Sequence, residues 1–264
     1  MDLARFGEEH HDYFDPNVYL NSYFKVEGRI EVYNDFALRC FHEFWSKVNN
    51  KNQRVLEFGG GPVICNLIPA TPYAQEIVFT EYTEKNRREV QKWLQESPDA
   101  HDWSAYFKFF VETLEGRKGE DITVRESELR KKISHVLPCD IERQDPVLWP
   151  PSYEVPSFDV VTSSLCLEAC VTSREGYRDT IAKLKSYLKP GGFIVLYGVL
   201  GESFYMVGQE KFHCFPLTKQ LVEETLISEG FKILDDMKIS LFKHEYESIC
   251  DAKGLFFVSA ILLS

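Results

Sequence analysis

The stretch VLEFGGGPVICNLI, residues 55–68, constrains the fold of this chain more than any other part of its sequence. An apolar, β-prone segment runs directly into three glycines and a proline. Glycine loses more conformational freedom on folding than any other residue, so the run indicates a backbone that turns sharply or lies against a ligand. A strand, a glycine-rich turn and a helix in this order are typical of a nucleotide-type site in an α/β sheet.

Short apolar segments alternate with helical patterns along most of the 264 residues. Apolar runs of strand length cover residues 53–59, 76–82, 134–141, 158–169, 193–200, 232–242 and 254–264. Strands joined by helices predict a mainly parallel sheet with both faces covered. Because no helix separates the last two strands, we expect that pair to be antiparallel.

Helical patterns fill the intervals between these strands, including residues 63–70 after the glycines and a charged stretch over 106–135. The N-terminal residues also have helical spacing of apolar side chains. We therefore expect a single domain over residues 1–264, with an N-terminal helical lid at 1–50 and an α/β core at 51–264.

The composition argues against several classes of protein. A net charge of −11 disfavours a broad surface for nucleic acid or anionic membranes. The N-terminus lacks the apolar core of a signal peptide, and no apolar run approaches the ~20 residues that span a bilayer. Seven cysteines without a CxxC pair or zinc-ligand spacing indicate reduced thiols in the cytoplasm and no metal site.

The glycine run matches neither common phosphate-binding fingerprint, because it lacks both GxGxxG and GK[ST]. Glu57, directly before the glycines, would repel a pyrophosphate, so we expect an uncharged or cationic ligand. Glu81 ends the next strand, twenty residues after Gly61, where an acid can accept both hydroxyls of a ribose. Asp140 ends the third strand and can accept from an adenine amino group. A plain tight turn with solvated acids at the strand ends is the alternative interpretation.

Longer stretches make the pattern specific. They run from FDPNVYLNSY through EFGGGP, TEYTEKNRREVQKWLQESPDAHDWS, VLPCDI, SSLCLEAC and LKPGGFIVLYGVLGESFYMVGQEKF to KGLFFVSA, and leave 30–50, 112–132 and 142–157 weakly matched. The chain resembles the class I S-adenosylmethionine-dependent methyltransferases. Within that class it is similar to the small-molecule amine N-methyltransferases for phenylethanolamine, nicotinamide and indolethylamine, and its CLEA and ESFY motifs are most similar to the phenylethanolamine enzyme.

The resemblance implies a Rossmann-like, doubly wound α/β fold with extra N-terminal lid helices and an antiparallel C-terminal strand. It implies S-adenosyl-L-methionine as cofactor, S-adenosyl-L-homocysteine as its product, and no metal. The implied cofactor contacts are Tyr19, Phe24, Gly59, Gly60, Gly61 and Pro62 at the methionine end, Glu81 at the ribose, Tyr82, Asn86, Asp140 and Ile141 around the adenine, and Ser163 and Ser164 beside the sulfonium.

Several of these positions depart from the family pattern. Phe24 replaces a tyrosine, Gly60 a serine and Glu81 an aspartate. Val63 replaces a threonine, and Cys65 stands where a tyrosine is common. These departures favour a reduced affinity for the cofactor without abolishing its site.

Two glutamates are the candidate catalytic residues. Glu168 and Glu202 follow the fourth and fifth strands, on the same rim as the glycine loop, and the resemblance implies that they face the amine. Carboxylates there would bind an ammonium and relay its proton through water, and two acids near each other raise each other's pKa. The alternative is a pair of solvated glutamates at helix starts. The nicotinamide enzyme carries an aspartate at the position of Gly198, and a third acid of the phenylethanolamine enzyme falls on Cys250.

The candidate substrate contacts are aromatic or apolar. They are Tyr205, Leu165, His11, Phe14 and Tyr246. Core packing is the alternative role for Tyr205 and Leu165, and a structural or solvated role is the alternative for the histidine.

The sequence therefore predicts an S-adenosylmethionine-dependent N-methyltransferase for a small arylalkylamine of the phenylethanolamine type. Indolethylamine, nicotinamide or another pyridine, and thioether acceptors are alternatives within the class. A catalytically inactive cofactor-binding regulatory protein is the alternative from another class, which the missing hydroxyl at Phe24 favours and the retained glutamates disfavour. We expect a cytoplasmic monomer whose partner is the small-molecule amine.

Overall fold

The computed structural model describes residues 4–26, 32–48, 50–119, 121–151, 153–155, 157–242 and 249–263. Among these residues an eight-stranded sheet has the strand order β3-β2-β1-β4-β5-β10-β8, and β9 also pairs with β10. The strands are β1 (Gln53–Phe58), β2 (Ala74–Glu81), β3 (Ile133–Pro138), β4 (Phe158–Ser164), β5 (Leu188–Leu200), β6 (Phe204–Val207), β7 (Glu210–His213), β8 (Phe231–Ile233), β9 (Lys238–Leu241) and β10 (Gly254–Leu262). Strands β6 and β7 form a separate hairpin.

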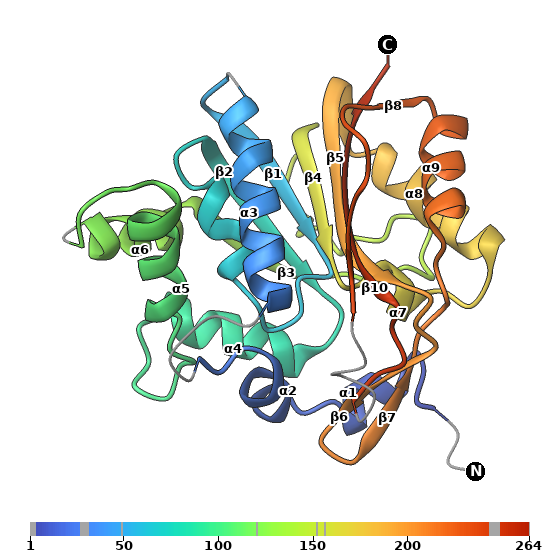
Figure 1. The fold of residues 1–264 in the computed structure, drawn as a ribbon, viewed down its shortest axis with the longest axis horizontal. Helices are drawn as coiled ribbons and strands as arrows, with labels where there is room; N and C mark the ends of the chain where they lie inside the picture. Colours follow the sequence, from blue (N-terminus) through green and yellow to red (C-terminus); the bar gives the residue numbers. More distant parts are fainter. Residues whose placement is uncertain are drawn as a thin grey trace.

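Helices cover both faces of the sheet, with α3, α5 and α6 on one side and α8 and α9 on the other (Figure 1). The helices are α1 (Glu9–Tyr13), α2 (Pro16–Tyr23), α3 (Val32–Lys47), α4 (Glu84–Leu94), α5 (Ser104–Lys108), α6 (Asp121–Lys132), α7 (Leu167–Cys170), α8 (Arg174–Lys185), α9 (Lys219–Ser228), the 3-10 helix η1 (Cys65–Ala70) and the π-helix η2 (Phe109–Leu114). The described part of residues 1–50 is mainly helical, as expected.

The strand directions confirm the sequence prediction. Strands β1 to β5 run parallel to one another, whereas β10 runs antiparallel to β5, β8 and β9. The chain leaves β1 toward β2 on one side and returns to β4 on the other, which makes the β1–β4 boundary a topological switch point. Ligands of such sheets bind outside the carboxyl ends of the strands at this point.

The parallel strands read as nearly continuous apolar runs because both faces of the sheet are buried. Successive side chains point to opposite faces, so Val55 packs with residues of α3 and Leu56 with residues of α8 and α9. Val160 and Val161 on β4 divide in the same way. All four side chains are fully buried.

Two segments differ from the sequence prediction, one in its type of helix and the other in its length. The segment after the glycines forms the 3-10 helix η1 rather than an α-helix, since Pro69 lies inside it and has no N–H for a helical hydrogen bond. The strand expected over 158–169 stops at Ser164, because Leu165 has a φ of 51°. A left-handed residue ends an extended strand.

Two further differences concern the C-terminal third. The strand expected over 232–242 is divided into β8 and β9, with Asp235 and Asp236 between them, and acidic residues are depleted from strands. The β6–β7 hairpin was not predicted. It turns at Gly208, whose φ is 61°.

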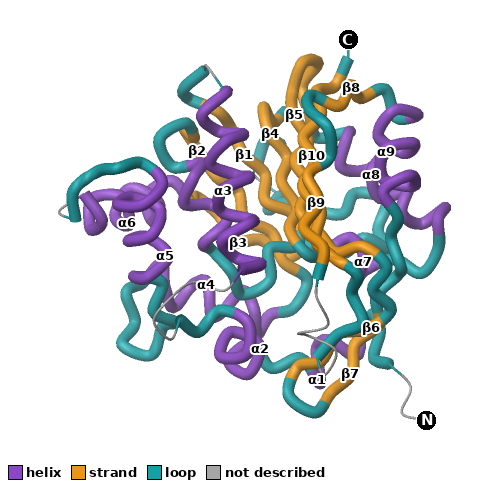
Figure 2. The backbone as a smooth tube through the Cα atoms, viewed as in Figure 1, coloured by secondary structure: helices purple, strands orange, loops and turns teal. Residues whose placement is uncertain are grey.

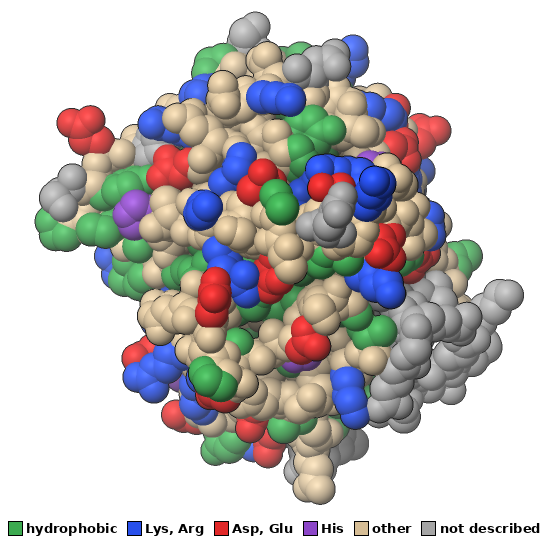
Figure 3. Space-filling model, turned by 90° about the vertical axis from the view of Figure 1, so that its left-hand side faces the viewer, with side chains coloured by type: hydrophobic (Ala, Val, Ile, Leu, Met, Phe, Trp, Pro, Cys, Tyr) green, Lys and Arg blue, Asp and Glu red, His purple; other side chains and the backbone are tan. Residues whose placement is uncertain are grey.

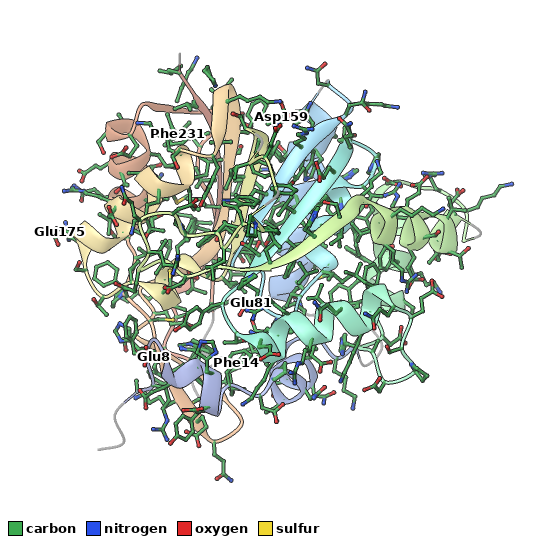
Figure 4. All side chains as sticks on the ribbon, turned by 180° about the vertical axis from the view of Figure 1, so that it is seen from behind. Glu8, Phe14, Glu81, Asp159, Glu175 and Phe231 are labelled. Atoms are coloured by element: carbon green, nitrogen blue, oxygen red, sulfur yellow. The ribbon has the colours of Figure 1, made fainter. Side chains whose placement is uncertain are left out.

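The hairpin, α1 and α2 gather at the carboxyl-end rim of the parallel strands (Figure 2). Arg5 pairs with Phe212 as a parallel bridge, so the N-terminal segment extends the hairpin. Glu81 and Phe14 lie toward one end of the molecule, and Asp159 and Phe231 lie at the opposite end (Figure 4).

The surface of the molecule carries mixed charges. On the face seen in Figure 3, acidic and basic side chains are interspersed rather than gathered by sign. Within the described ranges, none of the helices combines the length and the apolarity that crossing a membrane requires.

Candidate active site

A cavity of about 240 Å³ lies at the carboxyl ends of β1, β2 and β4, bounded by residues of α1, α2 and β6. Most of the residues singled out in the sequence line it. These are Phe14, Tyr19, Phe24, Gly59, Gly60, Gly61, Pro62, Glu81, Tyr82, Asn86, Asp140, Ile141, Ser164, Leu165, Glu168, Glu202 and Tyr205. The fold thus brings the expected cofactor contacts and the two candidate catalytic acids into one space.

Three predicted residues are not among its lining. Ser163 is buried, and its hydroxyl donates to the Phe58 carbonyl at 2.9 Å. His11 is exposed, and its ring lies 4.4 Å from that of Tyr82. Tyr246 falls outside the described residues.

The glycine run is explained by two different constraints. A Cβ at Gly59 would lie 2.1 Å from the Cys166 sulfur, and a Cβ at Gly60 would lie 2.4 Å from the Phe79 ring, so the protein itself excludes side chains there. At Gly61, where φ is 61°, a Cβ would meet nothing within 4 Å. The third glycine therefore leaves open space on the cavity side of a left-handed turn.

Glu81 organises the loop around this space. Its Oε2 accepts from the Gly61 N–H at 3.0 Å, while its Oε1 accepts from the Thr83 N–H at 2.9 Å, the Thr83 hydroxyl at 3.2 Å and the Asn86 amide at 3.0 Å. The longer side chain of glutamate, compared with aspartate, thus contacts both the glycine loop and the start of α4. Because Oε1 already has three donors, Oε2 is the oxygen with capacity for a ligand hydroxyl.

Glu57 does not act on the cavity as the sequence suggested. Its carboxyl is buried beneath the loop and accepts from the Thr162 hydroxyl, and burial raises its pKa to about 7. It is not among the residues that line the cavity. A pyrophosphate in the cavity would therefore not face the Glu57 carboxyl, contrary to the sequence prediction.

The two candidate catalytic acids are both buried. Glu168 accepts from the Val199 N–H at 3.0 Å, and burial raises its pKa to about 7. Glu202 accepts from the Cys214 thiol, with 3.0 Å between Oε2 and Sγ. Burial raises the pKa of Glu202 to about 8, and the nearby charge of Glu168 contributes in the same direction. The charge of Glu168 thus makes Glu202 harder to ionise.

The backbone beside Glu168 has no room for another side chain. A Cβ at Gly198 would lie 2.7 Å from the Phe256 ring and 3.0 Å from Glu168 Oε1. In this chain the acidic group at that point of the cavity therefore comes from α7, not from β5.

Leu165 lines the cavity in an unusual backbone conformation. Its φ of 51° is a strained conformation for a residue with a Cβ, and its N–H donates to the Tyr197 carbonyl at 2.8 Å. Strained backbone of this kind is concentrated at functional sites.

Aromatic side chains form the opposite wall, and one contact there was missed. His10 of α1 lines the cavity, with its Nε2 3.3 Å from the Tyr205 hydroxyl and its Nδ1 3.1 Å from the Gly7 carbonyl. Burial lowers the pKa of His10, so the ring is neutral and Nε2 accepts from Tyr205. The sequence offered two adjacent histidines, and on a helix as short as α1 spacing does not show which one faces inward.

The fold and the glycine-loop cavity define a class I methyltransferase. Solved structures with this fold include magnesium protoporphyrin IX methyltransferase from Synechocystis with bound S-adenosylmethionine, with a TM-score of 0.57, 11% identity and coverage of 96% of this chain and 94% of that chain. An S-adenosylmethionine-dependent methyltransferase from Methanosarcina mazei has a TM-score of 0.52, 14% identity and coverage of 83% and 97%. At these identities the similarity establishes the fold alone.

Sequence comparison identifies the family. The profile of the NNMT/PNMT/TEMT family matches residues 4–262, so the chain belongs to this family of S-adenosylmethionine-dependent N-methyltransferases. Human phenylethanolamine N-methyltransferase is 30% identical over 94% of this chain and 88% of its own length. Human nicotinamide N-methyltransferase is 32% identical over 96% and 94%, and rabbit (Oryctolagus cuniculus) indolethylamine N-methyltransferase is 33% identical over 86% and 86%. Such similar identities do not select the acceptor.

The residues of the cavity fit S-adenosylmethionine. Asn86 Oδ1 and Ser164 Oγ are buried and have no hydrogen-bond partner among the described residues, although both side chains line the cavity. Buried polar atoms are seldom left unpaired, so these two indicate a polar ligand. The open space at Gly61 allows that ligand to approach the backbone.

Proposed function

We propose that this enzyme methylates the nitrogen of a small arylalkylamine, such as a phenylethylamine or a catecholamine-like biogenic amine. The observation that carries the proposal is the pair of buried carboxyls, Glu168 and Glu202, in an aromatic cavity beside the glycine loop. Neither carboxyl forms an ion pair with a described lysine, arginine or histidine. A cationic ligand would therefore supply the counter-charge that these two buried carboxyls lack.

The cofactor contacts follow from the lining of the cavity. The Glu81 Oε2 would hold the ribose, and the open backbone at Gly61 would let the methionine end approach. The unpaired oxygens of Asn86 and Ser164 would face the adenine and the sulfonium, respectively. Tyr82, Asp140 and Ile141 would surround the adenine, and Tyr19 would contact the methionine end, where Phe24 supplies only a ring. When bound, S-adenosylmethionine supplies an electrophilic methyl group and needs no metal.

The acids prepare the amine. An alkylamine reaches the enzyme as an ammonium ion, which the ionised form of Glu168 or Glu202 would bind. Their pKa values of about 7 and about 8 let them accept its proton near neutral pH, directly or through water. The proton then resides on a carboxyl, and the nitrogen lone pair is free to react.

Aromatic side chains orient the acceptor and exclude water. The ring of Tyr205 would contact the aromatic part of the substrate, and its hydroxyl is held by His10. Phe14 of the N-terminal lid and Leu165 would close the pocket from two further sides. Holding the amine in one orientation supplies much of the rate enhancement in a displacement reaction.

The crowding around Gly198 bears on the alternative acceptors. A pyridine site with an acid at that position would require Phe256 and Glu168 to move. This favours an alkylamine over nicotinamide as the acceptor. Indolethylamines share the alkylamine group and are the second candidate, while an inactive cofactor-binding protein would have no use for the two acids.

A methyl-transfer assay over phenylethylamines, indolethylamines, nicotinamide and thioethers tests the proposal, after calorimetry has measured binding of S-adenosylmethionine. Glu202→Gln is expected to raise the KM for alkylamines and leave the cofactor Kd near normal. Glu175→Gln, on the exposed surface of α8, is the matched control (Figure 4). Cofactor binding without turnover of any amine would support the regulatory alternative instead.

The proposed setting is a monomer in the cytoplasm that acts on a small molecule and not on nucleic acid or membranes. All seven cysteines are free thiols, which suits a reducing compartment. The net charge of −11 suits a cationic substrate. Within the described residues, no cluster of three or more histidine, cysteine or acidic side chains is arranged to hold a metal ion.

A further inference from the structure

Two thiols lie against one of the acids in the cavity. The Cys214 Sγ is 3.0 Å from Glu202 Oε2, and the Cys250 thiol interacts with the same carboxyl. Both cysteines are buried and line the cavity. Burial and the adjacent carboxyl raise the pKa of both thiols, that of Cys250 to about 11, so each keeps its proton and can donate it in a hydrogen bond.

The backbone fixes both thiols relative to Glu202. Cys214 directly follows β7, and its N–H donates to the Ser203 carbonyl at 2.9 Å. Cys250 forms an antiparallel bridge with Tyr205 on β6. Glu202 is the residue before Ser203, so its carboxyl lies beside a short strand that is held on both edges.

We infer that Cys214 and Cys250 are positioning residues for Glu202, whose carboxyl they hold toward the cavity as weak S–H donors that leave it able to accept a proton. This inference rests on the proposed function of Glu202 as the acid that receives the amine. A thiol is a much weaker donor than a hydroxyl or an N–H. Stronger donors stabilise the ionised carboxylate and lower its pKa, which would make it a poorer base near neutral pH.

The other acids near Glu202 also raise its pKa, and the nearby phenols carry no charge. Glu168 on α7 and Asp251 raise its pKa by their charge. The Asp251 carboxylate accepts from the Ser203 N–H and hydroxyl and from the Phe204 N–H, so its oxygens are engaged by these donors. Tyr23 on α2 and Tyr205 on β6 are neutral, since burial raises the pKa of both phenols.

Two substitutions at Cys214, one that strengthens the hydrogen-bond donor and one that removes it, test the inference. Cys214→Ser supplies a stronger donor of similar size, and Cys214→Ala supplies none. The serine variant is expected to move the acidic limb of the pH profile of kcat/KM to lower pH by roughly 0.5–1 unit, and the alanine variant to move it to higher pH. Cys250→Ser should shift the limb in the same direction as Cys214→Ser. Since Glu168 and Glu202 interact, the limb reports the pair.

Cys40→Ser is the control, because Cys40 is a buried thiol on α3 outside the cavity, and this variant should leave the limb unmoved. A second readout needs no turnover. Carbon-13 NMR titration of the glutamate carboxyls in the ligand-free protein, with Glu202→Gln for assignment, should show the same opposite shifts.

The inference would be overturned if the acidic limb of the pH profile and the carboxyl titration did not move. It would also be overturned if both Cys214 variants moved them in the same direction. If Cys214→Ala does not fold, the two serine variants still decide the outcome. Should Glu202→Gln leave amine kinetics unchanged, the proposed role of Glu202 in the amine site would be wrong. If the Cys214 variants still shifted the Glu202 titration in the NMR experiment, the inference about the thiols would stand although the role of Glu202 in the reaction had failed.

Discussion

Replacing Glu202 by glutamine should change how the stability of the protein depends on pH. Glu202 is 6% exposed, and burial raises its pKa from the ordinary 4.5 to about 8. Between these two pH values the folded chain holds a proton that the unfolded chain has released. The free energy of unfolding therefore falls as the pH rises from about 4.5 to about 8, and is level above that range.

The size of the effect follows from the two pKa values. Each pKa unit corresponds to about 1.4 kcal/mol, so a carboxyl whose pKa rises from 4.5 to about 8 removes a few kcal/mol of stability, up to about 5, across this range. Glu57 and Glu168 contribute in the same direction, each with a pKa of about 7. Glutamine has no charge to bury, so the variant should lose the part of the pH dependence that comes from Glu202. It should retain the parts that come from Glu57 and Glu168.

Urea unfolding at pH 5.5 and 8.5 measures the prediction. The difference in unfolding free energy between the two pH values should be smaller in Glu202→Gln than in the unsubstituted protein by a few kcal/mol. The exposed Glu175→Gln should reproduce the unsubstituted difference. Equal differences for Glu202→Gln and the unsubstituted protein would refute the reasoning, because they would mean that the Glu202 carboxyl ionises as freely in the fold as in water.

Three further substitutions test the cavity. Glu81→Ala should weaken S-adenosylmethionine binding by roughly 1.5–3 kcal/mol in calorimetry, since it removes the carboxylate proposed to accept from the ribose hydroxyls; an unaltered Kd would contradict this role. Gly60→Ser introduces the common family residue but should lower the unfolding free energy by about 1–3 kcal/mol, because its Cβ would overlap the Phe79 ring; a denaturant curve with an unchanged midpoint would contradict the packing. Gly198→Asp should reduce turnover of every amine by displacing Glu168, and new activity on nicotinamide with amine turnover retained would show that the site adapts.

The sheet could be predicted from the sequence because its determinants are local. Each parallel strand is a short apolar run, and buried parallel strands require that pattern on both faces. The glycine run indicated the turn after β1, and the absent helix indicated the antiparallel end. The β6–β7 hairpin escaped because its strands are four residues each and only half-buried, so their pattern is weak.

The site was predicted less evenly, for a physical reason. Strand-end residues such as Glu81 and Asp140 lie at the same rim whenever the strands are parallel, so the predicted parallel direction was enough to bring them together. The inward choice of His10 over His11 depends on how α1 docks against the hairpin, through the bridge between Arg5 and Phe212. The strained φ of Leu165 likewise follows from tertiary contacts that no local pattern encodes.

The position of β10 has a consequence for synthesis in the cell. This strand follows all the other described strands along the chain, yet it lies between β5 and both β8 and β9. While the ribosome is still making earlier segments, β5 has an unpaired edge and β8 and β9 have no neighbour to join. Nascent chains are therefore expected to stay open to chaperones until residues 254–262 have been made, and messages truncated before residue 254 should yield products for proteolysis rather than partly active enzyme.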